Sequence, residues 1–323
     1  MPSIVPPSGV WCPAVTFFNP DTDELALDAQ ARYFHYLSTT GLAGLVILGT
    51  NAETFLLTRE ERKELVITAR RAVGPHFPLM VGVGGHSTRQ VLQYIADAAD
   101  AAANSVLLLP PAYFGAATTP QVVEAFYDDV AKRSPLPIVI YNFPGVCNGV
   151  DLQSDLIANL AQRHSNIVGV KLTCGSVAKI TRLAAVLPKE RFAVFGDQSD
   201  FILGGLTSGS SGCIAAFTNV FPRTIAHIYK LHQQGRNDEA LALHQKAALA
   251  EQLIKAGIAA TKYAAAIHSA KYAGIDNAVE LLRPRKPYFE PAPAIREKVM
   301  STMAEVARIE QSLGSYPNLS ARL

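Results

Sequence analysis

Two apolar runs, IVIYN at residues 138–142 and IVGVKLT at residues 167–173, flank a helical pattern over residues 152–163. Short runs rich in Val and Ile are typical of buried strands, and a helix between two such runs is typical of a parallel βαβ unit. The second run contains a charged side chain, Lys171. The segment therefore predicts two parallel strands with one lysine placed on the second.

The same alternation of apolar runs and helical patterns continues along residues 10–233. It favours parallel strands joined by crossover helices, and eight such units within residues 1–235 match the usual size of a (β/α)8 TIM barrel, about 250 residues. The alternative is a doubly wound open sheet, but no GxGxxG motif follows the first run. The predicted strands are residues 10–18, 42–49, 79–84, 105–110, 138–142, 167–173, 192–197 and 212–218, and the predicted helices are residues 28–39, 59–73, 88–102, 120–134, 152–163, 177–186, 200–207 and 222–233.

After Gly235 the strand-like runs stop. Residues 237–274 are rich in Ala, Leu, Lys and Gln with helical spacing, RPRKP at residues 283–287 interrupts the pattern, and residues 294–313 resume it. We expect an α/β chain made of a catalytic barrel over residues 1–235 and a C-terminal helical domain over residues 236–323. The expected role of this second part is structural, either packing on the barrel or forming a subunit interface.

Charge and hydropathy argue against large charged or membrane partners. The formal net charge is +2 and the Lys and Arg residues are scattered, so we expect no nucleic-acid partner and no polybasic membrane patch. No run of eighteen apolar residues predicts a membrane span, and the N-terminus does not resemble a secretory signal. We expect a chain without nucleic-acid or membrane partners.

The cysteines and histidines indicate the compartment and the absence of a metal. The four cysteines form no CxxC pair and the eight histidines have no HExxH context, so we expect a reduced, cytoplasmic protein without a catalytic metal. The last three residues, Ala321, Arg322 and Leu323, loosely resemble an SKL-type peroxisomal address. A match of three residues occurs by chance too often to favour a peroxisomal location over a cytoplasmic one.

The chemistry of a barrel lies at the carboxyl ends of its strands, where Tyr141 and Lys171 are predicted. Neighbouring strands are about 4.8 Å apart, so the tyrosine hydroxyl can reach the lysine nitrogen. Burial lowers the pKa of a lysine toward that of the free amine, which attacks carbonyl groups. The alternative is a lysine that extends along the strand end into solvent.

Two further loops follow predicted strands. GTNAE at residues 49–53 can offer backbone N–H groups and the Thr50 hydroxyl to a substrate carboxylate, and its alternative is an ordinary polar loop. PPAYF at residues 110–114 holds Tyr113 behind two rigid prolines, either as a reactive side chain or as a packed interface aromatic. A phenol, an amine and a carboxylate-binding turn together favour Schiff-base chemistry on a 2-oxo acid.

These motifs, with SSGCIAAFTNV at residues 210–220, resemble the dihydrodipicolinate synthase and N-acetylneuraminate lyase family over the whole chain. The resemblance implies a class I, pyruvate-type aldolase on a (β/α)8 barrel, commonly a homotetramer, with a covalent Schiff base and no cofactor. Residue by residue, Lys171 is similar to the Schiff-base lysine, Tyr141 to the proton-relaying tyrosine, Thr50 and Asn51 to the carboxylate-binding pair, Tyr113 to the tyrosine inserted into a neighbouring subunit's site, and Ile214 to the residue whose backbone carbonyl faces the pocket.

Departures from the family pattern bear on the substrate. Where the synthase has an arginine for its second substrate, this chain has GVCN at residues 145–148, which disfavours a lysine-biosynthetic synthase. VWCPAVTFF at residues 10–18, the segment 41–62 and GVGGHST at residues 82–88 are similar to the fungal 2-keto-3-deoxy-L-galactonate aldolase branch of the family. This likeness implies cleavage of that 2-keto-3-deoxy sugar acid to pyruvate and L-glyceraldehyde in D-galacturonate catabolism.

Alternatives remain open at this point. The same site could cleave 4-hydroxy-2-oxoglutarate or serve another pyruvate-dependent lyase, and a non-catalytic metabolite-binding barrel is the alternative of another class. The hydroxyls of the departing half need polar contacts, for which we expect Asp197 and Gln198, just beyond the seventh strand. Helix capping before Asp200 is the alternative role for both.

Overall fold

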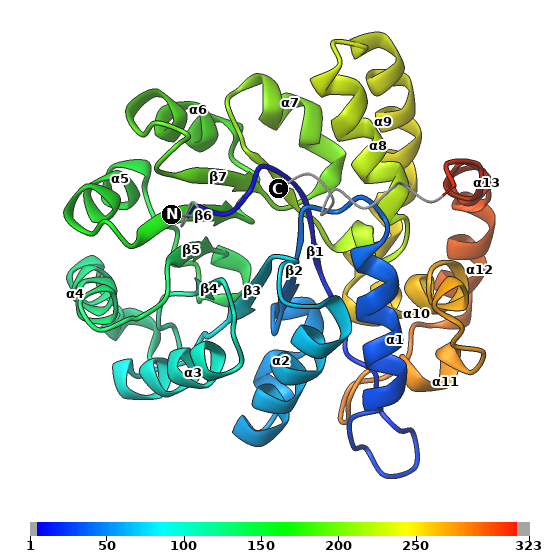
Figure 1. Cartoon of the computed structure of the whole chain (residues 1–323), viewed down its shortest axis with the longest axis horizontal. Coiled ribbons are helices and arrows are strands. Elements are labelled where there is room, and N and C mark those ends of the chain that lie inside the picture. Colours follow the sequence, from blue (N-terminus) through cyan, green and yellow to red (C-terminus); the bar gives the residue numbers. More distant parts are fainter. Residues whose placement is uncertain (1–4, 315–323) are drawn as a thin grey trace.

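The computed structural model describes residues 5–314 and shows a closed barrel of eight parallel strands in sequence order (Figure 1). The first strand pairs with both the second and the eighth, which closes the barrel. The predicted TIM barrel is thereby confirmed. The strands are β1 (Gly9–Pro13), β2 (Gly44–Ile47), β3 (Leu79–Gly82), β4 (Ser105–Leu108), β5 (Ile138–Asn142), β6 (Ile167–Leu172), β7 (Ala193–Gly196) and β8 (Gly212–Ile214).

One helix follows each strand and the helices surround the barrel (Figure 1). Several begin at capping side chains: Thr58 caps the second helix with Glu61 in a capping box, and Ser87 caps the third. The helices are α1 (Leu27–Ser38), α2 (Arg59–Val73), α3 (Thr88–Asp100), α4 (Pro120–Ala131), α5 (Ser154–Arg163), α6 (Val177–Val186), α7 (Ile202–Thr207) and α8 (Pro222–Gln233).

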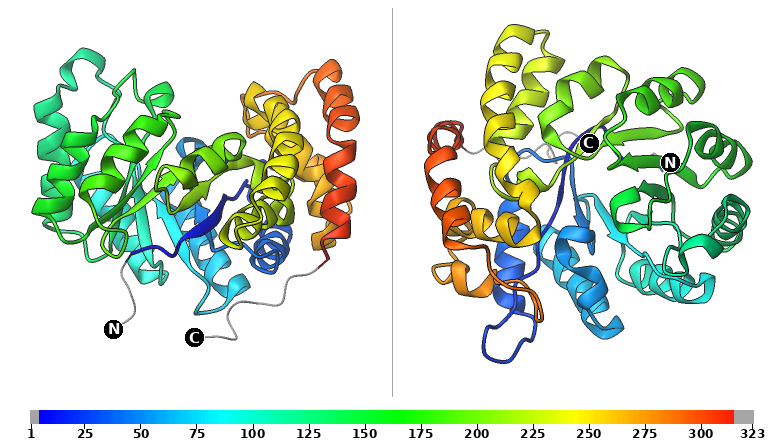
Figure 2. Two further views of the ribbon diagram at one scale, coloured as in Figure 1. Left: turned by 90° about the horizontal axis from the view of Figure 1, so that it is seen from above. Right: turned by 180° about the vertical axis from the view of Figure 1, so that it is seen from behind.

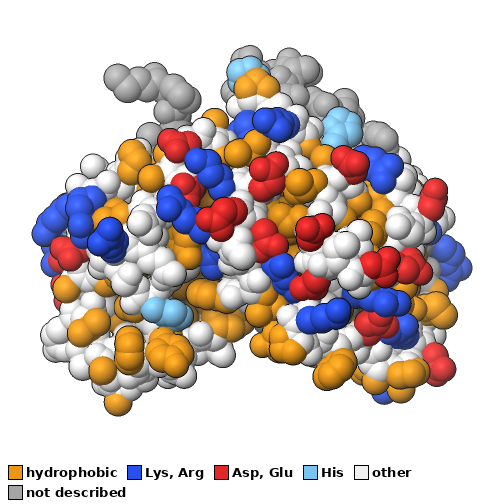
Figure 3. Space-filling view, turned by 90° about the horizontal axis from the view of Figure 1, so that it is seen from below, with side chains coloured by type: hydrophobic (Ala, Val, Ile, Leu, Met, Phe, Trp, Pro, Cys, Tyr) orange, Lys and Arg blue, Asp and Glu red, His pale blue; other side chains and the backbone are white. Residues whose placement is uncertain are grey.

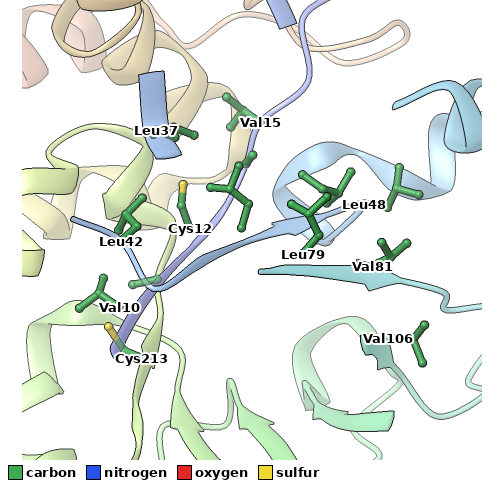
Figure 4. Packing of buried hydrophobic residues seen from close by; sticks show 14 of the residues in the cluster. Val10, Cys12, Val15, Leu37, Leu42, Leu48, Leu79, Val81, Val106 and Cys213 are labelled. Atoms are coloured by element: carbon green, nitrogen blue, oxygen red, sulfur yellow. The ribbon is translucent and has the colours of Figure 1, made fainter. Parts of the chain in front are cut away.

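Two apolar layers result from the alternation of side chains along the strands. The inner layer fills the barrel, where Trp11, Val46 and Phe195 lie. The outer layer lies between strands and helices, and Figure 4 shows part of it, with Val10 and Cys213 among its side chains. On β6 the outward Val170 and Leu172 belong to the outer layer, whereas Lys171 alternates with them and faces the interior.

Most predicted strands are longer than the observed ones, and their carboxyl ends differ most at β1 and β8. β1 ends at Pro13 and β8 ends at Ile214, because Asn219, in the one-turn helix Ala216–Asn219, ties both strand ends together. Its side-chain amide accepts a hydrogen bond from Val15 N–H and donates one to the Pro13 carbonyl. These side-chain bonds replace the ladder bonds that longer strands would have made.

The C-terminal helices stand on one side of the barrel (Figure 2). The segment of predicted helical spacing over residues 237–274 is divided, because Gly257 has a positive φ of 126°, and the predicted helix over residues 294–313 is divided at Met303. Residue 235 stays our proposed domain boundary. The helices are α9 (Asn237–Glu251), α10 (Ile258–His268), α11 (Ala278–Leu281), α12 (Pro293–Thr302) and α13 (Ala304–Ser312).

The C-terminal helices share one apolar layer with the barrel helices. Ala247 of α9 and Ala264 of α10 lie in the same cluster as Ile225 and Ile228 of α8. Within residues 5–314, no helix combines the length and the apolar character needed to cross a membrane. Residues 321–323, in which we noted a peroxisome-like address, lie outside the described residues.

Candidate active site

Lys171 lies inside the barrel beside Tyr141. The register of β5 and β6 pairs the two residues directly, and the lysine is only 1% exposed. Its Nζ donates a hydrogen bond to Tyr141 Oη at 3.2 Å and lies 4.4 Å from the centre of the tyrosine ring. The predicted contact between hydroxyl and amine is confirmed, and the lysine does not reach solvent.

Asp197 is the second neighbour of the lysine. It follows β7 directly, and its Oδ1 lies 2.5 Å from Lys171 Nζ. The structure shows that Asp197 balances the charge of the lysine, and its predicted contact with substrate hydroxyls stays a prediction. Gln198, the next residue, is half-buried.

The carboxylate changes the expected charge state of Lys171. Burial lowers the pKa of this lysine, but the negative charge and hydrogen bond of Asp197 outweigh burial and hold the pKa above its usual value. The expectation that burial alone yields a free amine is therefore wrong. At neutral pH the resting side chain is an ammonium ion, and it must lose a proton before it can attack a carbonyl.

Tyr141 connects Lys171 by hydrogen bonds to Thr50, in the loop after β2. Its hydroxyl lies 3.2 Å from Thr50 Oγ1. An ammonium ion has no lone pair, so the tyrosine hydroxyl accepts from Lys171, and it shares a second hydrogen bond with the Thr50 hydroxyl. The residues Lys171, Tyr141 and Thr50 thus form one hydrogen-bonded row across β6, β5 and the loop after β2.

The turn with Thr50 and Asn51 is held in a strained backbone conformation. A one-turn helix spans Thr50–Ala52, and Leu48 and Glu53 on either side have left-handed φ values of 62° and 57°. Leu48 can adopt this conformation because Gly82 has no side chain, since a Cβ there would lie 1.9 Å from the Leu48 carbonyl oxygen. Among the described residues, the N–H groups of Thr50 and Asn51 make no hydrogen bond, so they can face a ligand.

Glu53 anchors this turn to the C-terminal helices, a contact that the sequence did not predict. Its buried carboxylate accepts a hydrogen bond from Lys262 Nζ on α10 at 2.5 Å and one from Arg285 N–H at 2.8 Å. The available signal was Lys262 itself, a lysine within the apolar run IAATKYAAAIH, which resembles the setting of Lys171.

Thr173 is another side chain that we had not singled out. It lies two residues after Lys171, so strand alternation directs it toward the same side. Its hydroxyl is buried and has no hydrogen-bond partner within residues 5–314. Alternation from Lys171 could have identified it.

The remaining predicted site residues lie in two different settings. Ile214 is buried inside the barrel at the end of β8. Tyr113 is 73% exposed, and its ring contacts His86 and Phe114 rather than the lysine. In the single chain Tyr113 is therefore a surface aromatic, and its role in a neighbouring subunit stays a prediction.

A cavity of about 550 Å³ opens beside Thr50. Val146, from the loop where the synthase has its arginine, lines it together with Phe55 and Phe289. Among the described lining residues, Glu53 is the only one with a charged side chain, and Lys262 neutralises that charge. Figure 3 shows hydrophobic side chains gathered along the lower edge of the molecule, on both sides of a notch. The described residues form no group of His, Cys, Asp or Glu that could hold a metal ion.

Known proteins resemble this chain over nearly its whole length. Residues 6–306 match the model of the dihydrodipicolinate synthetase family. A protein of Coccidioides immitis (strain RS), provisionally named a mitochondrial 4-hydroxy-2-oxoglutarate aldolase, is 65% identical over 309 residues, which cover 96% of this chain and 98% of that protein. An L-threo-3-deoxy-hexylosonate aldolase of Hypocrea jecorina is 37% identical over 270 residues, 80% of this chain and 85% of that protein.

A solved structure agrees with the sequence relatives. A crystal structure from Coccidioides immitis, provisionally described as a dihydrodipicolinate synthase family protein, has a TM-score of 0.92 and 61% identity to this chain. The match covers 98% of this chain and 100% of the other. By its fold, its family model and its aldolase relatives, this protein belongs to the dihydrodipicolinate synthetase family and is a lyase of the aldolase type.

Proposed function

We propose that this protein is a class I aldolase that cleaves a 4-hydroxy-2-oxo acid to pyruvate and an aldehyde through a Schiff base on Lys171. The observation that carries the proposal is the hydrogen-bonded row of Lys171, Tyr141 and Thr50 inside the barrel, with Asp197 against the lysine. A barrel that only bound metabolites would have no use for a buried amine between a base and a phenol.

Substrate binding begins at the turn after β2. The N–H groups of Thr50 and Asn51, with the Thr50 hydroxyl, hold the substrate carboxylate, and Ile214 lines the opposite wall. This places the C2 ketone against Lys171 Nζ. Such positioning lowers the barrier by several kcal/mol, because the reacting atoms no longer have to find each other.

Schiff-base formation needs a neutral amine. Asp197 is the nearest base and accepts the ammonium proton, after which the nitrogen attacks C2 and forms a carbinolamine. Tyr141 donates a proton to the leaving hydroxyl, water departs, and an iminium ion remains.

Carbon–carbon cleavage follows from the iminium ion. The tyrosinate of Tyr141 takes the proton of the C4 hydroxyl, the C3–C4 bond breaks, and its electron pair moves to the nitrogen. The products are an aldehyde and a pyruvate enamine on Lys171. Protonation at C3 and attack of water on the resulting iminium ion release pyruvate and restore the lysine.

The substrate that the relatives support best is 4-hydroxy-2-oxoglutarate, which would give pyruvate and glyoxylate. This was the alternative to the sugar acid that we expected from the sequence. The support is the provisional name of the relative that is 65% identical over 96% of the chain. The relative named an L-threo-3-deoxy-hexylosonate aldolase, after the compound class that includes 2-keto-3-deoxy-L-galactonate, is only 37% identical.

The sugar acid remains the second candidate because of the charges at the site. The carboxylate of Asp197 repels a second substrate carboxylate but accepts hydrogen bonds from hydroxyls, and the unpartnered Thr173 hydroxyl offers another contact. The described residues that line the cavity beside Thr50 include no lysine, arginine or histidine that would attract a dicarboxylate. Initial rates on both substrates, measured side by side as pyruvate release, test the choice.

The aldolase proposal fails if wild type releases no pyruvate from either substrate and therefore does not differ from the Lys171→Arg variant. If both substrates are cleaved, the ratio of kcat/KM values identifies the preferred one. We also propose a homotetramer, supported by exposed Tyr113 and Phe114, and a cytoplasmic location, for which the mitochondrial name of the relative is the alternative.

A further inference from the structure

Ser199, in the loop between β7 and α7, is held by α9 through all of its polar groups. Glu251 accepts hydrogen bonds from its N–H at 3.1 Å and from its hydroxyl at 2.5 Å. His244 Nε2 lies 2.8 Å from its carbonyl oxygen. A carbonyl only accepts, so Nε2 carries the proton, and one residue of the loop is bound from three directions by one helix.

This contact lies two residues from the reacting centre. Only Gln198 separates Ser199 from Asp197 in the sequence. The carboxylate of Asp197 lies 2.5 Å from Lys171 Nζ. Backbone fixed at Ser199 limits the directions in which Asp197 can point. A loop freed from α9 would let Asp197 turn toward solvent and leave the lysine without its base.

Glu251 is buried, with 2% of its surface exposed, among groups from four elements. Asp200 lies on the same loop, Lys255 on the one-turn helix Gln252–Ala256, His244 on α9 and Cys213 on β8. Burial raises the pKa of Glu251 to about 7, while the hydrogen bonds from Ser199 lower it and the charge of Asp200 raises it. Burial also lowers the pKa of His244, so this histidine is neutral at pH 7.

We propose that Glu251 is a positioning residue whose ionised carboxylate holds the loop after β7 so that Asp197 faces Lys171. The inference rests on the proposed Schiff-base function, because it acts through Asp197. Ionised Glu251 accepts two charge-assisted hydrogen bonds from Ser199, which are about twice as strong as neutral ones. The protonated acid keeps the contacts but loses the charge assistance, and the loop loosens.

The test is the rate at which pyruvate and borohydride label Lys171, measured from about pH 5.5 to about pH 8 for wild type and Glu251→Gln. The amide keeps the shape of the side chain and cannot ionise. We expect the ratio of wild-type to variant rate to rise from about one to about fivefold, the factor that corresponds to one net hydrogen bond, with a midpoint near the Glu251 pKa of about 7. A ratio that does not change with pH overturns the inference.

The matched control is Glu310→Gln. Glu310 on α13 is also a buried carboxylate, and it accepts hydrogen bonds at 2.7 Å from the hydroxyl and the backbone N–H of Thr224. Thr224 is at the start of α8, so this contact does not hold the loop that contains Asp197. We expect its labelling ratio to stay near one at every pH. An equal pH-dependent loss in this control would show a general packing effect and overturn the assignment to Glu251.

Folding is checked by thermal melting. The raised pKa of Glu251 means that the native state binds its proton more tightly than the unfolded state, so its contribution to stability is present at low pH and is lost as pH rises through about 7. Glutamine does not ionise, so the variant should melt no lower than wild type at about pH 8 while labelling more slowly.

Ser199→Ala is the second variant. It removes a hydrogen bond that lowers the pKa of Glu251, so the rate midpoint should move to higher pH than in wild type. An unmoved midpoint would overturn the inference even if the glutamine variant did not fold. If wild type itself forms no adduct on Lys171, the proposed function fails and this inference with it.

Discussion

The Asp197 carboxylate lies 2.5 Å from Lys171 Nζ, the same nitrogen that donates a hydrogen bond to Tyr141 Oη inside the barrel. This ion pair decides the resting state of the site. Burial alone would favour the free amine, but the paired carboxylate keeps the proton on the lysine. The enzyme therefore stores the nucleophile in an inactive, protonated form beside the group that can remove the proton.

Asp197→Asn should shift the pH dependence of Schiff-base formation. Without the negative charge, burial is the main remaining influence and lowers the pKa of Lys171. The fraction of free amine then rises at lower pH, so the rising limb of pyruvate labelling should move to lower pH than in wild type, while the maximal labelling rate should fall because the lysine has lost the base that takes its proton. Labelling rates across the pH range measure this shift.

The control for Asp197 is Asp97→Asn. Asp97 is also paired with a cation, Arg59 at 2.7 Å, but the pair joins α2 and α3 outside the barrel. In this variant the labelling rate should rise with pH over the same range as in wild type. If the rise of the labelling rate with pH did not shift in the Asp197→Asn variant, the assigned charge state of Lys171 would be wrong.

Tyr141→Phe should lower kcat by about 10² to 10⁴, the usual contribution of a general acid–base group. The substitution removes the hydroxyl that links Lys171 to Thr50 but keeps the ring. Steady-state pyruvate release measures the loss.

Tyr127→Phe provides the comparison for this change. Tyr127 is buried and its hydroxyl donates to the Leu108 carbonyl at 2.9 Å, away from the lysine. It should cost about 1 kcal/mol of stability and leave kcat unchanged. If Tyr141→Phe turned over substrate at the wild-type rate, the proton relay would have to be assigned to another group.

Gly82→Ala should weaken carboxylate binding. The new Cβ would lie 1.9 Å from the Leu48 carbonyl oxygen, so the strained turn before Thr50 has to move. We expect KM for the 2-oxo acid to rise about tenfold, which corresponds to roughly 1.4 kcal/mol of binding. The control is Gly204→Ala on α7, where no atom lies within 4 Å of the added carbon, and unchanged KM in both variants would refute the role of this turn.

Lys262→Met should destabilise the fold from a distance. The methionine fills the space of the lysine stem but leaves the buried Glu53 carboxylate without its cation, a change that costs about 3–5 kcal/mol. Chemical denaturation measures the loss. Adding Glu53→Gln should restore most of the stability, and a double variant no more stable than the single one would show that the ion pair is not the cause.

Local pattern was sufficient to predict the barrel and the contact of Lys171 with Tyr141, because both follow from strand alternation and strand adjacency. Contacts between distant segments were not predictable in this way. The partner of Glu53 is 209 residues away and the bonds that end β1 come from Asn219, 204 and 206 residues away. Likewise the sequence placed Asp197 at the site, but only the fold shows that its carboxylate faces the lysine rather than solvent.

The Schiff base on Lys171 is tested most directly by borohydride reduction in the presence of pyruvate, followed by peptide mass spectrometry on wild type and Lys171→Arg. We expect one reduced pyruvate adduct, on the peptide that contains Lys171, and none on the arginine variant, whose side chain stays protonated. An adduct on a different lysine, or no adduct on folded wild-type protein, would contradict this expectation.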